Sequence, residues 1–194
     1  MTSFFAGALS VLIVLPLQRV AQGALGGILL LLVWALIEEG IKFCTALLVD
    51  FRNKAYDEPL DAMIYLITVA LGFAAFENVL FAIKSFASGG ITVSLVTVLM
   101  RFLGATLLHV LVSATLGGFI AMAFYSRLGK KVLYASLGLI VATILHTAFN
   151  FFILNEVSSS GNGNIFVVFA GLWTGIILLL LFFEKVKTIT IKNI

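Results

Sequence analysis

Long apolar segments dominate this sequence and restrict the folds that it can adopt. Of its 194 residues, 62% are hydrophobic and only 11% are charged, and the mean hydropathy is +1.19. Helices that cross a bilayer need such composition, because each one satisfies its backbone hydrogen bonds internally. The apolar runs are continuous, whereas a transmembrane barrel shows short alternating strands. The sequence therefore predicts an all-α, polytopic helical membrane protein with a single membrane-embedded domain over residues 1–194.

Hydropathy divides the chain into about six predicted spans, each near the ~20 residues that a bilayer requires. They are residues 3–17, 24–49, 60–83, 102–125, 132–154 and 165–183. The apolar stretch 91–125 is too long for one upright helix, and Arg101 and Gly104 interrupt it. We therefore expect 91–101 to form an extra interfacial or re-entrant helix that could act as a gate. The Ser, Gly and Asn residues of 158–164 predict an outward-facing, flexible loop.

Basic residues predict the orientation in the membrane. Alternate loops and the C-terminal tail collect most of them: Arg52, Lys54, Arg127, Lys130, Lys131, Lys185, Lys187 and Lys192. The other side has only Arg19, Lys84 and Arg101. Because basic residues concentrate in cytoplasmic loops, we expect a multi-pass protein of the cell membrane with both termini in the cytoplasm.

Charge and cysteine content limit the partners. The net charge of +3 comes without a dense basic face, so nucleic acid is not an expected partner. The single cysteine, Cys44, excludes a disulfide within the chain. Small residues such as Gly117 and Gly118 permit close helix contacts within one chain as easily as between two, which leaves the oligomeric state open.

Six titratable residues interrupt the predicted spans. They are Glu38, Glu39, Lys42, Glu77, His109 and His146. A charge near the bilayer centre costs roughly 2.5–3.5 kcal/mol, and residues of this kind usually pair with one another, bind a metal or take part in catalysis. At 1.5 Å per residue, the three glutamates and the two histidines lie roughly 10–20 Å below the outer surface, on four different helices. This overlap in depth predicts one buried site.

The spacing of these residues suggests how they interact. Glu38 and Lys42 are four residues apart and Glu39 and Lys42 three apart, so Lys42 can neutralise one carboxylate and leave the other free. The alternative is a salt-bridge cluster that only neutralises itself. Glu77 has no neutralising group nearby on its own helix, and it needs a partner from another helix, a metal or a proton.

Two histidines and a carboxylate form a familiar catalytic zinc set that leaves a position for water. A further carboxylate, Glu38 or Glu39, could then serve as general base. Asn150 follows His146 by one helical turn and could donate a hydrogen bond to an oxyanion. The soluble H-E-x-x-H zinc motif is absent, so the local sequence alone does not establish a metal. Arg101 is better explained as an interfacial anchor or loop clamp than as a catalytic group.

Together these motifs resemble the PrsW family of intramembrane proteases. The matching residues are Glu38-Glu39-x-x-Lys42, Phe73-x-x-x-Glu77, His109 and His146-x-x-x-Asn150, within roughly residues 30–155. That family is related to the CAAX prenyl endopeptidases and the bacteriocin-processing immunity proteins. The resemblance implies an endopeptidase that cleaves a membrane-anchored protein in the bilayer, such as an anti-sigma factor at site 1.

The resemblance also implies residue roles. Glu38 or Glu39 would activate water, and Asn150 would assist the oxyanion. The metal ligands for zinc, or the groups that orient the water, would be Glu77, His109 and His146. A metal-free glutamate mechanism has been argued for the CAAX relatives. Those relatives carry His where this chain has Glu77, which argues against a CAAX substrate.

Two other functions remain compatible with the sequence. Buried Glu, Lys and His residues also serve proton relays, so a proton- or ion-coupled transporter is an alternative. Transporters often show internal repeats, and we find none in this sequence. The same residues could also persist in a non-catalytic membrane scaffold. The leading prediction is a protease that acts near the outer membrane face.

Overall fold

The computed structural model describes residues 1–158 and 165–189, and these residues form helices joined by short turns and loops. The elements are α1 Thr2–Ala24, α2 Gly27–Val49, α3 Pro59–Arg101, the π-helical turn η1 Phe102–Thr106, α4 Leu107–Met122, α5 Leu128–Ser158 and α6 Ile165–Lys187. No strand occurs in the described ranges, so the all-α prediction is confirmed there. The predicted loop 158–164 lies outside the described residues except for Ser158, as does Lys192.

Length and composition identify a multi-pass membrane protein. Four stretches of the described chain are long and apolar enough to cross a bilayer: Thr2–Ala24, Pro59–Met122, Leu128–Ile153 and Val168–Lys187. Helix α2 has a similar length but carries Glu38, Glu39 and Lys42. Its outer surface is nevertheless apolar, since Ile28 and Leu48 are about three-fifths exposed. Such side chains are suited to contact with lipid.

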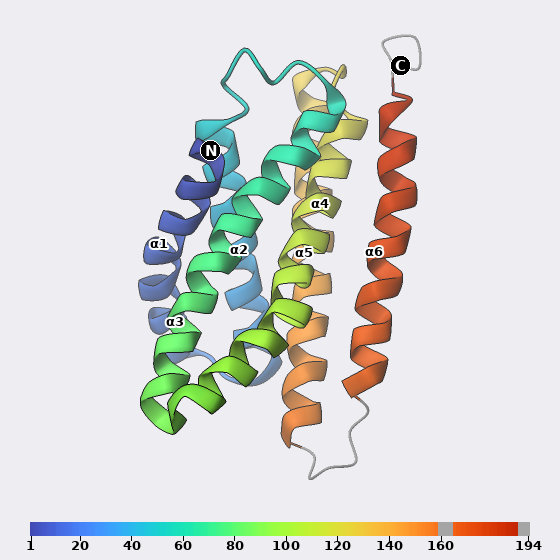
Figure 1. Cartoon of the computed structure of the whole chain (residues 1–194). Coiled ribbons are helices and arrows are strands. Elements are labelled where there is room, and N and C mark those ends of the chain that lie inside the picture. The colour runs from blue at the N-terminus through green and yellow to red at the C-terminus, as the bar shows by residue number, and fades with distance from the viewer. Residues whose placement is uncertain (159–164, 190–194) are drawn as a thin grey trace.

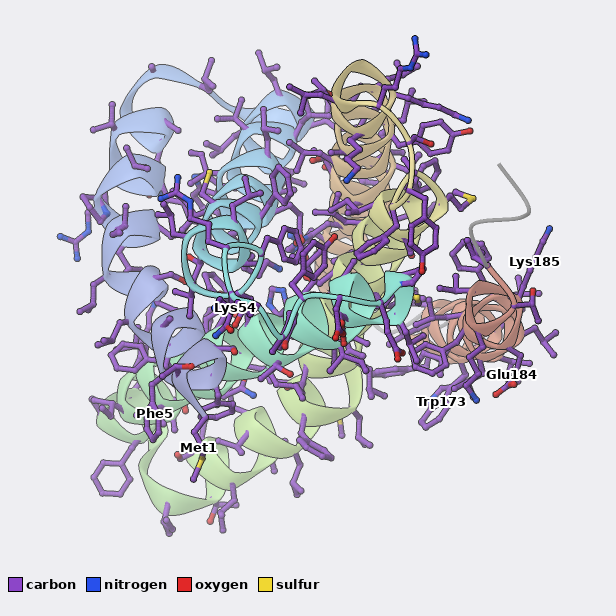
Figure 2. The ribbon with its side chains drawn as sticks, turned by 90° about the horizontal axis from the view of Figure 1, so that it is seen from above. Met1, Phe5, Lys54, Trp173, Glu184 and Lys185 are labelled. Atoms are coloured by element: carbon purple, nitrogen blue, oxygen red, sulfur yellow. The ribbon has the colours of Figure 1, made fainter. Side chains whose placement is uncertain are left out.

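Successive helices run in opposite directions across the bundle (Figure 1). The start of α1, the α2–α3 loop and the end of α6 lie at one end, here the terminal end; the α1–α2 turn and the bend of α3 lie at the opposite end. Helix α6 stands at the edge of the bundle, and Figure 2 shows Glu184 and Lys185 pointing away from the other helices. The densest packing therefore lies among α1 to α5.

Helix α3 bends sharply at Gly90, where φ is 73° and ψ is −166°. Glycine adopts this left-handed region without the Cβ clash of other residues. The bend separates a first arm, residues 59–89, from a second arm, residues 91–101, which is the segment that the sequence sets apart. The second arm runs back along the first, and the Ser94 hydroxyl donates to the Ala82 carbonyl at 3.0 Å. The π-helical turn follows at the predicted interruption and leads into α4.

Two glycines bring α1 and α3 into backbone contact. A Cβ atom on Gly7 would lie 2.1 Å from the carbonyl oxygen of Val69, and one on Gly72 would lie 1.9 Å from that of Phe4. Small residues allow this approach, which side chains would prevent. One turn further along, Val11, Val14 and Phe73 form a buried cluster between the two helices. The contact therefore sets the position of the second half of α1 beside α3.

We expect Gly72→Ala to lower the thermal stability of the protein, because its Cβ would collide with the backbone of α1. Overpacking costs about 1–3 kcal/mol, which corresponds to a Tm decrease of roughly 2–10 °C for a chain of this size. Gly171→Ala is the matched control, since nothing lies within 4 Å of a Cβ there. Thermal unfolding of both purified variants in detergent tests this, and equal Tm values would contradict the proposed contact.

Candidate functional site

A buried lysine links two of the polar residues at the centre of the bundle. The side chains of Lys42 and Glu39 are fully buried, and Nζ of Lys42 donates to Oε1 of Glu39 at 2.6 Å. The same ammonium lies 3.0 Å from Nδ1 of His109. Because an ammonium group is only a donor, Nδ1 accepts this bond and Nε2 of His109 carries the proton. That Nε2–H group donates to Oε2 of Glu77 at 3.2 Å.

Glu39 fixes the second histidine as well. Nδ1 of His146 lies 2.7 Å from Oε1 of Glu39, and a carboxylate is an acceptor, so Nδ1 is the protonated nitrogen. Ser113 donates a longer bond of 3.4 Å to the other oxygen of Glu39. Both oxygens of Glu39 are thus occupied. Nε2 of His146 keeps its lone pair and lies 3.7 Å from Oε2 of Glu38.

Glu38 differs from its neighbour because one of its oxygens is open. Oε1 accepts a hydrogen bond of 2.7 Å from the side-chain amide of Gln18, and the Trp34 indole donates a bond of 3.1 Å to the backbone carbonyl of Gln18. Oε2 is buried and has no hydrogen-bond partner among the described residues. A buried acceptor without a partner costs free energy and usually marks a ligand site or a reacting group. This oxygen faces the free nitrogen of His146.

A second polar cluster lies between the two arms of α3, about three helical turns away from the bend at Gly90. Arg101 donates to Glu77 at 2.5 Å and to the side-chain oxygen of Asn78 at 2.9 Å. Asn78 in turn donates to the Thr106 hydroxyl at 2.9 Å, within the π-helical turn. These bonds join residues 23 to 28 positions apart in the sequence, which the bend at Gly90 makes possible. Arg101 therefore clamps Glu77, which accepts the hydrogen bond of His109.

A cavity of about 580 Å³ lies against both clusters. Its polar wall includes Glu38, Glu77, His109, His146 and Asn150. Its apolar wall includes Val14, Leu15, Phe73, Leu80, Leu108 and Ile153. Glu39 and Lys42 are not among the residues that line this cavity; they support the polar wall from behind. The cavity is large enough for several residues of an extended peptide, with open acceptors at its base.

The donor atoms at the base of the cavity fit a metal ion. Among the described residues, Glu38, His109 and His146 each offer a ligand atom, and these atoms lie within 4.8 Å of one another. Glu38 and His146 present a free oxygen and a free nitrogen, whereas Nε2 of His109 would have to release its proton and its bond to Glu77 before it could bind the ion. Two histidines and one carboxylate are a common zinc set. The sequence predicts Glu77 as the carboxylate, whereas the structure groups Glu38 with the two histidines.

Comparison with known proteins identifies the family. Residues 1–182 match the model of the PrsW family of intramembrane metalloproteases. The chain belongs to this family. It is 27% identical over 161 residues to Protease PrsW of Bacillus subtilis. This match covers 81% of this chain and 70% of that protein. It is 28% identical over 156 residues to Protease PrsW of Shouchella clausii. That match covers 80% of this chain and 65% of the relative.

A third PrsW relative gives a shorter match. Protease PrsW of Clostridioides difficile is 27% identical over 122 residues, which is 62% of this chain and 50% of that protein. The chain thus matches between half and seven tenths of the length of these relatives. No solved structure gives a significant match. Membership of the PrsW family makes this chain an intramembrane peptidase and decides against the ion-coupled transporter.

The structure brings the residues chosen from the sequence to one place. Five of them line the cavity, and Glu39 and Lys42 contact His146 and His109 directly. Four residues of the site were missed: Gln18, Trp34, Asn78 and Ser113. Gln18 was missed because its polarity and that of Arg19 ended the predicted first span at residue 17, whereas α1 continues to Ala24. Helix continuation was the only signal that could have placed this amide beside Glu38.

We expect Lys42→Met to destabilise the PrsW family member strongly. It would leave the fully buried Glu39 carboxylate without its cation, and breaking a buried pair in this way costs about 3–5 kcal/mol. Thermal unfolding in detergent measures the loss, with the exposed Lys54→Met as control. The double variant Lys42→Met/Glu39→Gln should recover part of the stability, since no charge then remains unpaired. A double variant that is less stable than Lys42→Met would contradict this account.

We expect Gln18→Leu to reduce peptide cleavage about tenfold or more while the protein stays folded. The change removes the donor that holds Oε1 of Glu38 and therefore leaves the open oxygen free to turn. The control is Leu17→Ala, because Leu17 is exposed and does not line the cavity. Cleavage rates of both variants, together with their Tm values, separate misplacement of Glu38 from unfolding. A fully active, stable Gln18→Leu protein would show that Glu38 needs no support from α1.

Proposed function

We propose that this chain hydrolyses a peptide bond of a membrane-anchored protein inside the bilayer, with Glu38 activating the attacking water. The open Oε2 of Glu38 beside the free Nε2 of His146, at the base of the cavity, is the observation that supports this proposal. Two acceptors 3.7 Å apart can hold one water molecule between them. Glu39 is the less suitable base, because its oxygens accept bonds from Lys42, His146 and Ser113.

The proposed reaction uses groups with separate tasks. Glu38 accepts a proton from the water as the oxygen attacks the carbonyl carbon, and then delivers that proton to the leaving amine. His146 orients the water, and Glu39 holds the ring of His146. Asn150, in the cavity wall one turn after His146, donates a hydrogen bond to the developing oxyanion.

Zinc is the proposed cofactor, because the family consists of metalloproteases and the donor set fits. Glu38, His109 and His146 would hold the ion, and Glu38 would then act as a ligand instead of as the general base. When bound, zinc polarises the scissile carbonyl and lowers the pKa of a water ligand. Glu77, which the sequence predicts as a ligand, holds the ring of His109 through the Nε2–H bond as long as no ion is bound, and it would lose that bond when Nε2 takes the ion. A purely glutamate-based mechanism would use the same Glu38 and His146.

We further propose six crossings, formed by α1, α2, the first arm of α3, α4, α5 and α6, with the second arm of α3 as a re-entrant segment. Basic residues gather at the terminal end, which would therefore lie in the cytoplasm. The site then lies in the outer half of the bilayer. Cleavage of a membrane-anchored anti-sigma factor at site 1 is the proposed role.

Substitution of the two adjacent glutamates tests the assignment of the base. We expect Glu38→Gln to lower the cleavage rate about 10²- to 10⁴-fold, which is the usual contribution of a general base. Its Tm should change little, whereas Glu39→Gln should lose stability because it unpairs Lys42. Glu184→Gln on the exposed edge of α6 is the control. The assay follows release of a soluble tag from a single-span reporter in vesicles; normal cleavage by Glu38→Gln would refute the proposed mechanism.

Chelation tests the cofactor. If zinc is required, treatment with a chelator should abolish cleavage and remove about one equivalent of metal, and added zinc should restore both. His146→Ala and His109→Ala should each lower the zinc content of the purified protein, while Glu184→Gln should not. Undiminished cleavage by protein shown to be free of metal would instead assign the reaction to Glu38 alone.

A further inference from the structure

The basic residues of the opposite half share one location. Most basic residues of the described chain belong to segments at the terminal end, and Lys42 lies within α2. Three lie in the opposite half: Arg19 on α1, Lys84 on the first arm of α3 and Arg101 at the end of the second arm. All three line the cavity, on the side of Glu38 that faces the opposite end. We call these three residues the cationic rim.

Carboxylates of the described residues account for only one member of the rim. Arg101 is paired with Glu77, but Arg19 and Lys84 are exposed and form no ion pair with any carboxylate whose side chain is described. Basic residues that only anchor helices at a lipid surface extend outward around a bundle, toward the nearest head groups. Side chains from three separate segments that face one cavity instead indicate a ligand with negative charge.

The cavity between the rim and Glu38 is largely apolar. Leu15, Leu80 and Phe81 line it together with the rim, and the guanidinium carbon of Arg101 lies 3.7 Å from the ring centre of Phe81. An occupant must therefore present an apolar segment next to an anionic group. Arg101 also binds Glu77, which contacts His109, so an occupant that reaches Arg101 lies beside the reacting groups. In a peptidase, the molecule that lies beside the reacting groups is the substrate and not a resident lipid.

We propose that the cationic rim binds Asp or Glu side chains that flank the apolar segment of the protein substrate, on the side nearer the opposite end. This inference rests on the proposed function and specifies the substrate class of the same site. Lys84 and Arg19 supply charge at the mouth of the cavity, where a flexible acidic flank can reach them. Arg101 lines the same cavity and its side chain is 18% exposed, so the donors that Glu77 and Asn78 do not use are available to the same occupant.

The test uses three synthetic peptides with the same apolar segment of twenty Leu and Ala residues. Their flanks are four Asp, four Asn or four Lys residues. Binding to the Glu38→Gln protein in neutral phosphatidylcholine vesicles separates recognition from cleavage. Each exposed ion pair contributes about two- to fivefold to binding, so the Asp peptide should bind roughly tenfold tighter than the Asn peptide at low salt. The preference should shrink as salt is added.

Rim variants made in the Glu38→Gln protein locate the effect. Arg19→Gln and Lys84→Gln should each reduce the preference for Asp over Asn about two- to fivefold, and the double variant Arg19→Glu/Lys84→Glu should reverse it toward the Lys peptide. Lys54→Gln, an exposed lysine at the terminal end, is the matched control and should leave the preference unchanged. Equal binding of the Asp and Asn peptides, or a preference that survives both rim variants, would overturn the proposal.

Two further outcomes separate this proposal from its alternatives. If phosphatidylglycerol vesicles raise the Tm through Arg19 and Lys84 while no peptide preference exists, the rim binds lipid phosphate and the proposal is wrong. If the Asp peptide binds preferentially but the wild-type protein cleaves none of the peptides, the proposed role of the rim is supported and the proposed protease function is wrong. Cleavage of all three peptides without any flank preference would instead support the protease function and overturn the proposed role of the rim.

Discussion

The ammonium group of Lys42 is the interaction on which the site depends. It neutralises Glu39 and occupies Nδ1 of His109, so it fixes the charge of one and the tautomer of the other. Glu39, held in this way, then fixes the tautomer of His146. A single cation therefore determines where both histidines carry their protons. Glu38 lies outside this set of bonds, and for that reason one carboxylate oxygen stays available at the base of the cavity.

Two backbone features of the fold produce this arrangement, a close contact between helices and a bend within one helix. Close contact at Gly7 and Gly72 places α1 against α3, so that Gln18 reaches Glu38. The bend at Gly90 returns the chain along its own first arm, which brings Arg101 to Glu77. In a membrane, packing of this kind replaces the hydrophobic effect as the force that selects helix neighbours. The glycines therefore position the polar groups of the site.

The sequence predicted the helical architecture and the gathering of the polar residues at one site, because hydropathy and spacing along a helix are local properties. It could not show which of Glu38 and Glu39 has an open oxygen, since their hydrogen bonds involve Gln18 from α1 and Ser113 from α4. It predicted Glu77 as the carboxylate ligand; in the structure Arg101 and His109 bind Glu77, and Glu38 lies with the two histidines. Helices that are apolar on every face carry little information about rotation. Contacts between helices therefore had to come from the structure.

The positions of the charges suggest a direction of entry into the site. From the opposite end inward, the cavity presents the cations of Arg19 and Lys84, then an apolar wall, then the open oxygen of Glu38. A membrane-anchored polypeptide with an acidic flank matches this order, because its charged residues stay near the bilayer surface while its apolar segment enters. The same cations would repel a substrate with a basic flank. Discrimination of this kind works by exclusion as much as by attraction, and it acts before a peptide bond reaches Glu38.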